Sequence, residues 1–276
     1  MASQAVNAAT FAEQMPAHAC DAHLHIYGAQ GQGGADVAAY RAMQTRLGTR
    51  RAVIVTPRPH GTDNRITLEA IRRLGAADTR GVAVLHPSVS DTELARLHEG
   101  GVRGIRFTLY TPTHAVTTAD MIEPLAARVA ALGWHVQLHM TAEQIAAHRE
   151  MLKRLPAPIV FDHLARIAPE LGTAHPAFAT VQHLLGEGRA WIKLSAPYLV
   201  SQQGIGAAYR DQDALARAFY ETAPTRMVWG SDWPHVTERD KPTPGLLHAT
   251  LLRCLPEEAM RQLVLVDNPA QLYGFG

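Results

Sequence analysis

Short apolar runs alternate with amphipathic segments along nearly the whole chain. The runs that predict β-strands are Ala19–His25, Ala52–Thr56, Gly81–Leu85, Gly104–Phe107, His135–His139, Ile159–Asp162, Trp191–Leu194 and Met227–Gly230. They are apolar throughout rather than strictly alternating, which is typical of parallel strands that are covered on both faces.

The segments between these runs have the spacing of helices. They are Asn64–Leu74, Asp91–Glu99, Met121–Leu132, Glu143–Leu155, Ala177–Leu185, Asp211–Glu221, Gly245–Leu255 and Pro256–Leu263. About eight βα units in succession predict an α/β protein with a single (β/α)8 barrel, and a doubly wound open sheet is the competing arrangement. We expect the barrel over residues 19–276, preceded by a short N-terminal extension, residues 1–18.

Composition excludes several classes of partner. The 276 residues are 47% apolar and 18% charged, with a net charge of +1, so the chain has no electrostatic footprint for nucleic acid or a membrane surface. Cys20 and Cys254 belong to no CxxC pair, and no apolar stretch reaches the roughly 18 residues of a membrane span. We therefore expect a cytoplasmic protein, monomer or homo-oligomer, whose partner is a small molecule.

Polar residues stand where several of the apolar runs stop. In a barrel of parallel strands the active site lies at the carboxyl ends of the strands. The first run ends in Asp21-Ala22-His23-Leu24-His25, and residues i and i+2 of a strand point to the same side. His23 and His25 are thus expected to project together, ready to hold a metal or substrate oxygens, although two hydrogen-bonded histidines would give the same signal.

Three further runs lead to a histidine or an aspartate. The fifth ends in His139, the sixth leads to His163, and the eighth leads to Asp232. Each alone could be a capping or surface residue, but this many strand ends with such residues are hard to obtain by accident. Three imidazoles and one carboxylate suit zinc and leave a position for water.

These stretches resemble the amidohydrolase superfamily. The resemblance rests on DAHLH, IVFDH and WGSDWPH (229–235), which would end strands one, six and eight, and on HGTDN (60–64), GVRGIRF (101–107), WIKLSA and DNPAQLYGF (267–275). The most similar branch contains 2-pyrone-4,6-dicarboxylate lactonase and sugar-acid lactonases. The resemblance covers nearly the whole chain from residue 19 onward.

The resemblance implies a role for each of these residues. His23, His25, His139 and Asp232 would bind a divalent metal, with zinc the most suitable, or the histidines would donate hydrogen bonds in members that work without metal. His163 would polarise the scissile carbonyl or bind metal. Asp232 would act as the general base toward the attacking water.

Four further residues are candidates for substrate binding. Arg106 ends the fourth run, and a guanidinium that faces the barrel mouth suits a carboxylate. Arg166, His60 and Tyr198 are the others. The alternatives are a salt-bridged surface arginine, a loop cap at His60 and a half-buried tyrosine.

The loops after strands four and seven depart from the dicarboxylate branch. They read FTLYTPTHA and SAPYLVS and supply no further arginine. This favours a lactone with one carboxylate, or a neutral sugar lactone. We therefore predict a hydrolase that opens the lactone ring of a small carboxylate. A metal-dependent decarboxylase, a lactone isomerase and a non-catalytic barrel that binds a sugar acid remain as alternatives.

Overall fold

Eight parallel strands form one sheet in the computed structural model, which describes residues 14–28, 34–111, 113 and 115–276. Each strand pairs with the next one in chain order. The strands are β1 Cys20–Leu24, β2 Arg51–Val55, β3 Thr79–Ala83, β4 Val102–Thr108, β5 His135–His139, β6 Ile159–Phe161, β7 Ala190–Leu194 and β8 Met227–Trp229.

The sheet closes where the chain leaves β8 and runs beside β1. The backbone N–H of His25 donates to the carbonyl of Trp233 at 2.8 Å, and that of Asp232 donates to the carbonyl of His23 at 2.8 Å. Leu24 and Trp233 form an isolated parallel bridge. The structure is therefore the predicted (β/α)8 barrel and not the open sheet.

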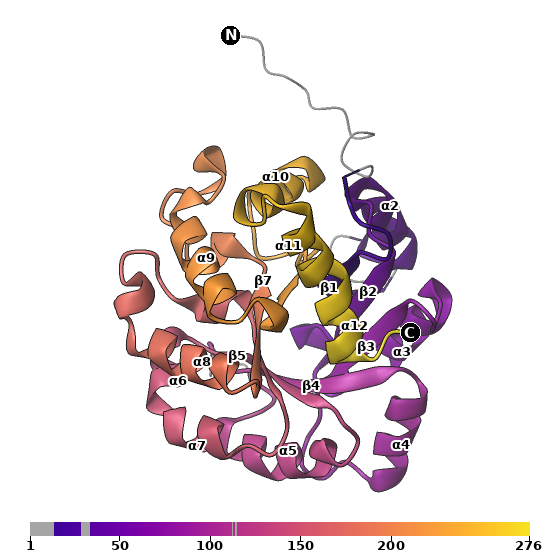
Figure 1. Ribbon diagram of the computed structural model, residues 1–276. Coiled ribbons are helices and arrows are strands. Elements are labelled where there is room, and N and C mark those ends of the chain that lie inside the picture. The colour runs from indigo at the N-terminus through magenta and orange to yellow at the C-terminus, as the bar shows by residue number, and fades with distance from the viewer. Residues whose placement is uncertain (1–13, 29–33, 112, 114) are drawn as a thin grey trace.

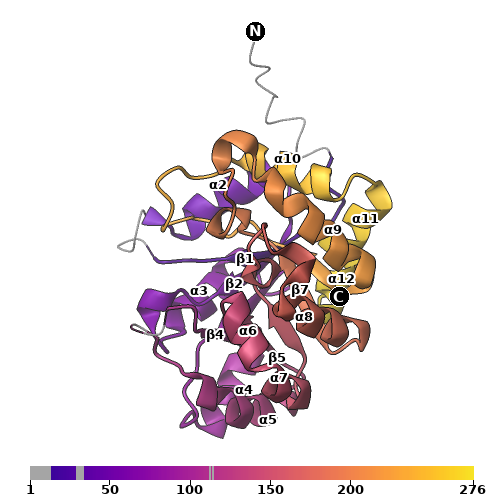
Figure 2. The same cartoon turned by 90° about the vertical axis from the view of Figure 1, so that its left-hand side faces the viewer.

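Helices surround the strands on their outer side (Figures 1 and 2). They are α2 Val37–Leu47, α3 Arg65–Leu74, α4 Asp91–Glu99, α5 Ile122–Ala130, α6 Ala142–Ala147, α7 Arg149–Arg154, α8 Pro176–Gly186, α9 Asp213–Thr222, α10 Pro244–Cys254, α11 Glu258–Gln262 and α12 Asn268–Tyr273. Helix α10, which follows β8, packs against α2, which follows β1. Within the described ranges, no helix is both long and apolar enough to cross a membrane.

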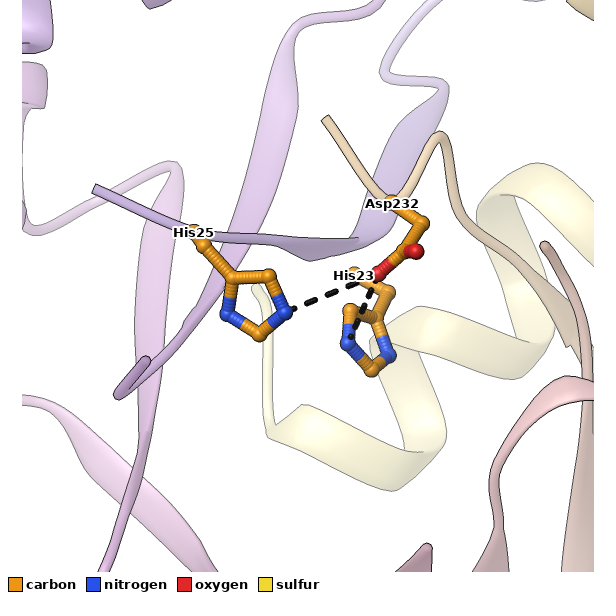
Figure 3. Close-up of side chains that lie close together, drawn as sticks. All are labelled: His23, His25 and Asp232. Carbon is orange, nitrogen blue, oxygen red and sulfur yellow. Dashed lines mark ion pairs between the residues drawn. The ribbon is translucent and has the colours of Figure 1, made fainter. Parts of the chain in front are cut away.

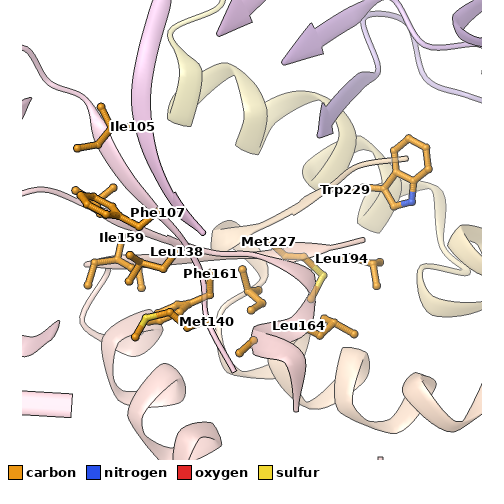
Figure 4. Close-up of a cluster of buried hydrophobic side chains, with 14 of the residues drawn as sticks. Ile105, Phe107, Leu138, Met140, Ile159, Phe161, Leu164, Leu194, Met227 and Trp229 are labelled. Atoms are coloured by element: carbon orange, nitrogen blue, oxygen red, sulfur yellow. The ribbon is translucent and has the colours of Figure 1, made fainter. Parts of the chain in front are cut away.

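The two faces of the strands carry different side chains. Large apolar side chains such as Phe107, Leu138 and Phe161 are fully buried in one cluster with residues of the surrounding helices (Figure 4). The opposite face looks into the barrel, because Lys193 of β7 contacts Gln137 of β5 at 2.8 Å although these strands are not neighbours. The interior of the barrel is therefore polar at the level of Lys193 and Gln137. Buried polar side chains are unusual in a packed core, and they point to a functional site.

Several helices differ from the sequence-based expectation. Helix α2 was not predicted, although the side chain of Asp36 caps its first turn. The predicted helix Glu143–Leu155 is two helices, α6 and α7, which meet at His148. Beyond α11, a π-helical turn at Leu263–Asp267 leads into α12, which was also missed.

The boundaries of the first and third strands also shift. β1 ends at Leu24, so His25 lies just beyond it, and β3 covers 79–83 rather than 81–85. Of the predicted N-terminal extension, residues 1–13 lie outside the described residues.

Candidate active site

His23, His25 and Asp232 meet at the seam where the barrel closes (Figure 3). Nε2 of His23 lies 3.4 Å from Oδ1 of Asp232, and Nε2 of His25 lies 3.6 Å from the same oxygen. The pairing of β1 with β2 shifts register between Asp21 and Leu24. Such irregularities re-aim side chains next to active sites. His23 and Asp232 are thus neighbours in space although about 210 positions separate them along the chain.

The hydrogen-bond partner of His25 determines which of its nitrogens is free. Its Nδ1 lies 2.8 Å from the carbonyl oxygen of Val55, which can only accept a hydrogen bond. In the neutral ring Nδ1 therefore carries the hydrogen, and Nε2 presents a lone pair toward Asp232.

The three residues could hold a metal ion. One nitrogen of each histidine and one oxygen of Asp232 all lie within 4.8 Å of one another. Among the described atoms, Nε2 of His23 is buried and has no hydrogen-bond partner. Two imidazole nitrogens and a carboxylate oxygen are a donor set that zinc accepts, so these residues fit such an ion.

His139 lies outside this group of three and contacts two arginines. Its Nδ1 is 2.9 Å from Arg106 Nη2, and its Nε2 is 3.2 Å from Arg166 Nη1. Burial, reinforced by the charge of Arg106, holds the pKa of His139 well below its ordinary value. A neutral imidazole has one bare ring nitrogen, so it can accept a hydrogen bond from only one of the two guanidinium groups at a time.

His163 stands beside the group of three. Its ring centroid is 4.8 Å from that of His23, and its Nδ1 lies 2.9 Å from the hydroxyl of Ser195. Burial lowers its pKa to about 4, so the ring is neutral at neutral pH. His163 and Asp232 have φ angles of 55° and 56°. Non-glycine residues rarely adopt such positive angles, and those that do are often found at functional sites.

The side chain of Asp232 is largely enclosed, at 13% exposure, and its neighbours favour the ionised form. Burial alone would raise the pKa of its carboxyl, but the neighbouring imidazoles, that of His163 first, hold it well below the ordinary value. The hydroxyl of Tyr198 donates to Oδ2. Tyr198, expected to bind substrate, therefore contacts the candidate base. A positioned carboxylate of this kind can accept a proton from water.

A pocket of about 240 Å³ opens above these residues. Its lining includes Arg106 and Arg58, and Asp232 is the only acid among the described residues that line it. Arg58 was missed by the sequence analysis. It lies three residues after the end of β2, in the stretch TPRPH, and that position is a signal that could have found it.

Of the other predicted substrate residues, His60 and Arg166 lie outside the pocket lining and Arg106 is part of it. His60 is not part of the lining, and its ring centroid is 6.0 Å from that of Tyr27, which is part of it. Arg166 lies over the ring of Tyr110, with its guanidinium carbon 4.7 Å from the ring centroid. Arg106 both lines the pocket and pairs with Asp162, Nε to Oδ2 at 2.9 Å.

A buried polar layer that the sequence analysis missed lies beneath the site. Asp162, Gln137 and Lys193 are almost completely buried and hydrogen-bond with one another or with His23. Burial lowers the pKa of Lys193 to about 8, although the charge of Asp162 opposes the shift. A charged residue inside a strand that is covered on both faces, as in WIKLSA, is the signal that could have found this layer.

The amidohydrolase family model matches residues 20–275, almost the entire barrel. The chain belongs to the amidohydrolase family. It is 35% identical to a 2-pyrone-4,6-dicarboxylate hydrolase of Comamonas testosteroni, over 94% of this chain and 91% of that one. It is 32% identical to a 4-sulfomuconolactone hydrolase of Rhizobium radiobacter, over 94% and 91%. A D-galactarolactone isomerase of Agrobacterium fabrum is 28% identical, over 85% and 80%.

Proposed function

We propose that this protein hydrolyses the lactone ring of a small carboxylate, with Asp232 as the general base. The observation that carries the proposal is the carboxylate of Asp232, which His25 and Tyr198 contact at the wall of a small pocket whose other charged lining groups are basic. The similarity to two lactone hydrolases supports the reaction class. A pocket below the usual 300–1,000 Å³ of ligand sites suits a single small ring.

In the proposed reaction a water molecule attacks the lactone carbonyl carbon while Asp232 takes one of its protons. The developing oxyanion needs hydrogen-bond donors. His163 is such a donor if the hydroxyl of Ser195 donates to its Nδ1, because Nε2 then carries the ring hydrogen. As the tetrahedral intermediate collapses, the bond between that carbon and the ring oxygen breaks. The proton held by Asp232 returns to the leaving oxygen.

The cationic lining supports a carboxylate on the substrate. Arg106 and Arg58 both reach the pocket, and guanidinium groups bind carboxylates with strong, charge-assisted hydrogen bonds. Arg166, His60 and Tyr198 stay candidate substrate residues at the edge of this region. The loops after strands four and seven supply no arginine, and Arg58, after strand two, places a second guanidinium at the pocket besides that of Arg106.

We propose zinc as the ion that His23, His25 and Asp232 would bind, and it would supply Lewis-acid polarisation of the carbonyl. His139 stays a predicted ligand, although both of its nitrogens face arginines. Elemental analysis and activity before and after chelation test this: zinc near one ion per chain supports it, and full activity of metal-free protein contradicts a catalytic ion. The cytoplasmic location and the oligomeric state stay predictions of the sequence.

A lactone isomerase is the second candidate, favoured by the similarity to the galactarolactone isomerase. The same carboxylate could remove a proton and return it elsewhere without net addition of water. A decarboxylase on this scaffold would instead release carbon dioxide. Mass analysis of the product separates the three, because only hydrolysis adds one water.

The direct test is a panel of small lactones, with and without a carboxylate, assayed for acid release with Asp232→Asn. We expect carboxylate-bearing lactones to turn over, and the variant to lose at least about 100-fold in kcat while folding normally, because its amide cannot accept the proton. Asp240→Asn, an exposed aspartate later in the same loop, is the matched control and should keep wild-type activity. An active Asp232→Asn variant would remove the assigned base, and tight binding without turnover would favour the non-catalytic barrel.

A further inference from the structure

The last residue of the WGSDWPH segment, His235, lines the pocket but has no part in the proposed reaction. Its Nε2 lies 2.9 Å from the carbonyl oxygen of Ser231. A carbonyl oxygen can only accept a hydrogen bond, so Nε2 carries the hydrogen of the neutral ring. Nδ1 is then the bare nitrogen, with a lone pair to offer.

This bare nitrogen lacks a partner within the protein. The described residues provide no hydrogen-bond donor to Nδ1 of His235, and the atom is not among the fully enclosed ones that are unpartnered. The side chain as a whole is only 5% exposed, and burial lowers the pKa of the imidazole, so the ring is neutral at neutral pH. Buried polar groups are normally hydrogen-bonded. Because His235 lines the pocket, a ligand there can supply the missing donor.

His235 and Arg106 stand on opposite walls of the pocket. Arg106 belongs to β4, and His235 follows β8, the strand that lies opposite β4 in a closed ring of eight. The ring of His235 also contacts that of Tyr198, which follows β7, with centroids 5.7 Å apart. A ligand whose carboxylate binds Arg106 therefore presents its far side to His235.

The chemistry of the pocket restricts what that far side can be. A lone pair on nitrogen is complementary to an O–H or N–H group. A second carboxylate has no hydrogen to donate and would leave Nδ1 of His235 unpaired. An ammonium group could donate, but the guanidinium groups of Arg106 and Arg58 would repel it. A neutral hydroxyl group satisfies both conditions.

We propose that His235 is a specificity-determining residue whose Nδ1 accepts a hydrogen bond from a hydroxyl group of the substrate. The substrate is then a lactone with a carboxylate on one side, bound by Arg106, and a hydroxyl group across the ring. The choice of a lactone rests on the proposed function, whereas the acceptor nitrogen in the pocket does not.

Binding to the wild-type protein tests the acceptor without any turnover. The ligands are cyclopentane carboxylic acids with a hydroxyl, a hydrogen or a second carboxylate across the ring, in both stereochemical forms, at about pH 8, where an imidazole is neutral. We expect the better-bound hydroxy acid to bind at least about 10-fold more tightly than the other two acids, because only it pairs Nδ1 of His235. Calorimetric titration measures the affinities.

The variant His235→Gln keeps an N–H donor for Ser231 but places no acceptor at the position of Nδ1. It should reduce the preference for the hydroxy acid to less than about two-fold. Equal affinity of the wild type for all three acids, or no binding of the hydroxy acid, overturns the assignment even if the variant fails to fold.

Turnover of the corresponding lactones provides the second readout. The ratio of kcat/KM with and without the hydroxyl group should be at least about 10 in the wild type and close to 1 in His235→Gln. A purely structural defect would lower both rates and leave their ratio unchanged. His235→Asn should recover part of the ratio, because its amide oxygen can accept near the position of Nδ1 and asparagine tolerates the φ angle of 56° found here.

His183→Gln, at an exposed histidine of α8, is the matched control and should keep the wild-type ratio. A ratio that stays the same in His235→Gln contradicts the assignment. Failure of every lactone to turn over, with the expected order of binding retained, contradicts the proposed function and leaves the acceptor role of His235 supported.

Discussion

In the proposed reaction, the carboxylate of Asp232 and the imidazole of His163 both act in their deprotonated forms. Asp232 must be ionised to accept a proton, and His163 is neutral in the proposed reaction. The same buried, close arrangement serves both needs, because it holds the pKa of Asp232 well below its ordinary value and lowers that of His163 to about 4. Asp232 therefore ionises at a pH well below its ordinary range, and His163 becomes neutral as the pH rises through about 4.

The pH profile of hydrolysis follows from these shifts. We expect kcat/KM to be flat between about pH 5 and 8 and to fall as the pH drops through about 4, where His163 gains its proton. Measurement on a carboxylate lactone, with circular dichroism at each pH to exclude acid unfolding, tests this. Half-maximal activity near pH 6.5 would mean that a histidine with an ordinary pKa controls the reaction.

Single residues were predictable where they end an apolar run, and less so where they lie inside one. His23 and His25 stand in the last residues of the first run, His163 and Asp232 follow the sixth and eighth runs, and the structure brings the four together. Lys193 and Gln137 stand inside such patterns, so their facing partners depend on strand positions that a single sequence does not specify. The contacts of His139 with two arginines depend equally on side-chain placement across strands.

At the scale of elements, the barrel strands were predictable because each is a short apolar run. The helices that the sequence analysis missed or joined have local causes. The α2 segment has only Val37, Tyr40, Met43 and Leu47 as buried positions among polar and alanine residues. The helix predicted over 143–155 breaks at His148, where the ψ angle of 14° departs from helical geometry without any glycine or proline to announce it.

Besides its backbone hydrogen bonds, the seam between β1 and the chain after β8 is held by the buried side chain of Asp21. Oδ1 of Asp21 accepts from the backbone N–H of Ser231 at 2.8 Å, and Oδ2 accepts from the Ser231 hydroxyl at 2.6 Å. Tyr40 of α2 also donates to Oδ2, at 3.1 Å. The next residue after Ser231 is Asp232, so Asp21 connects the closure of the barrel to the position of the proposed base.

Replacing Asp21 should therefore destabilise the fold. We expect Asp21→Ala to lower the free energy of unfolding by at least about 3 kcal/mol, because it leaves several buried donors unpaired, and Tyr40→Phe to lower it by about 1 kcal/mol. Urea unfolding measures both. Ser88→Ala, at an exposed position, is the control and should stay within about 0.5 kcal/mol of wild type. A fully stable Asp21→Ala variant would show that the seam does not depend on these bonds.

At the scale of the whole molecule, the closed barrel is what makes the site. His23 and Asp232 come from opposite ends of the chain, and the parallel topology brings the carboxyl ends of their strands to the same rim. The fold class was predictable from the succession of βα units. The lining of the pocket was not, because loop residues such as Arg58 set it and their shape does not follow from a periodic pattern.

A single turnover in ¹⁸O-labelled water, with enzyme in excess over a carboxylate lactone, tests the central claim most directly. If Asp232 acts as a base toward water, the hydroxy-acid product carries one ¹⁸O in its new carboxylate and Asp232 carries none. An unlabelled product with ¹⁸O in Asp232 would show that the carboxylate attacks the lactone itself. A product of unchanged mass would show isomerisation, and either result would contradict hydrolysis by Asp232-activated water.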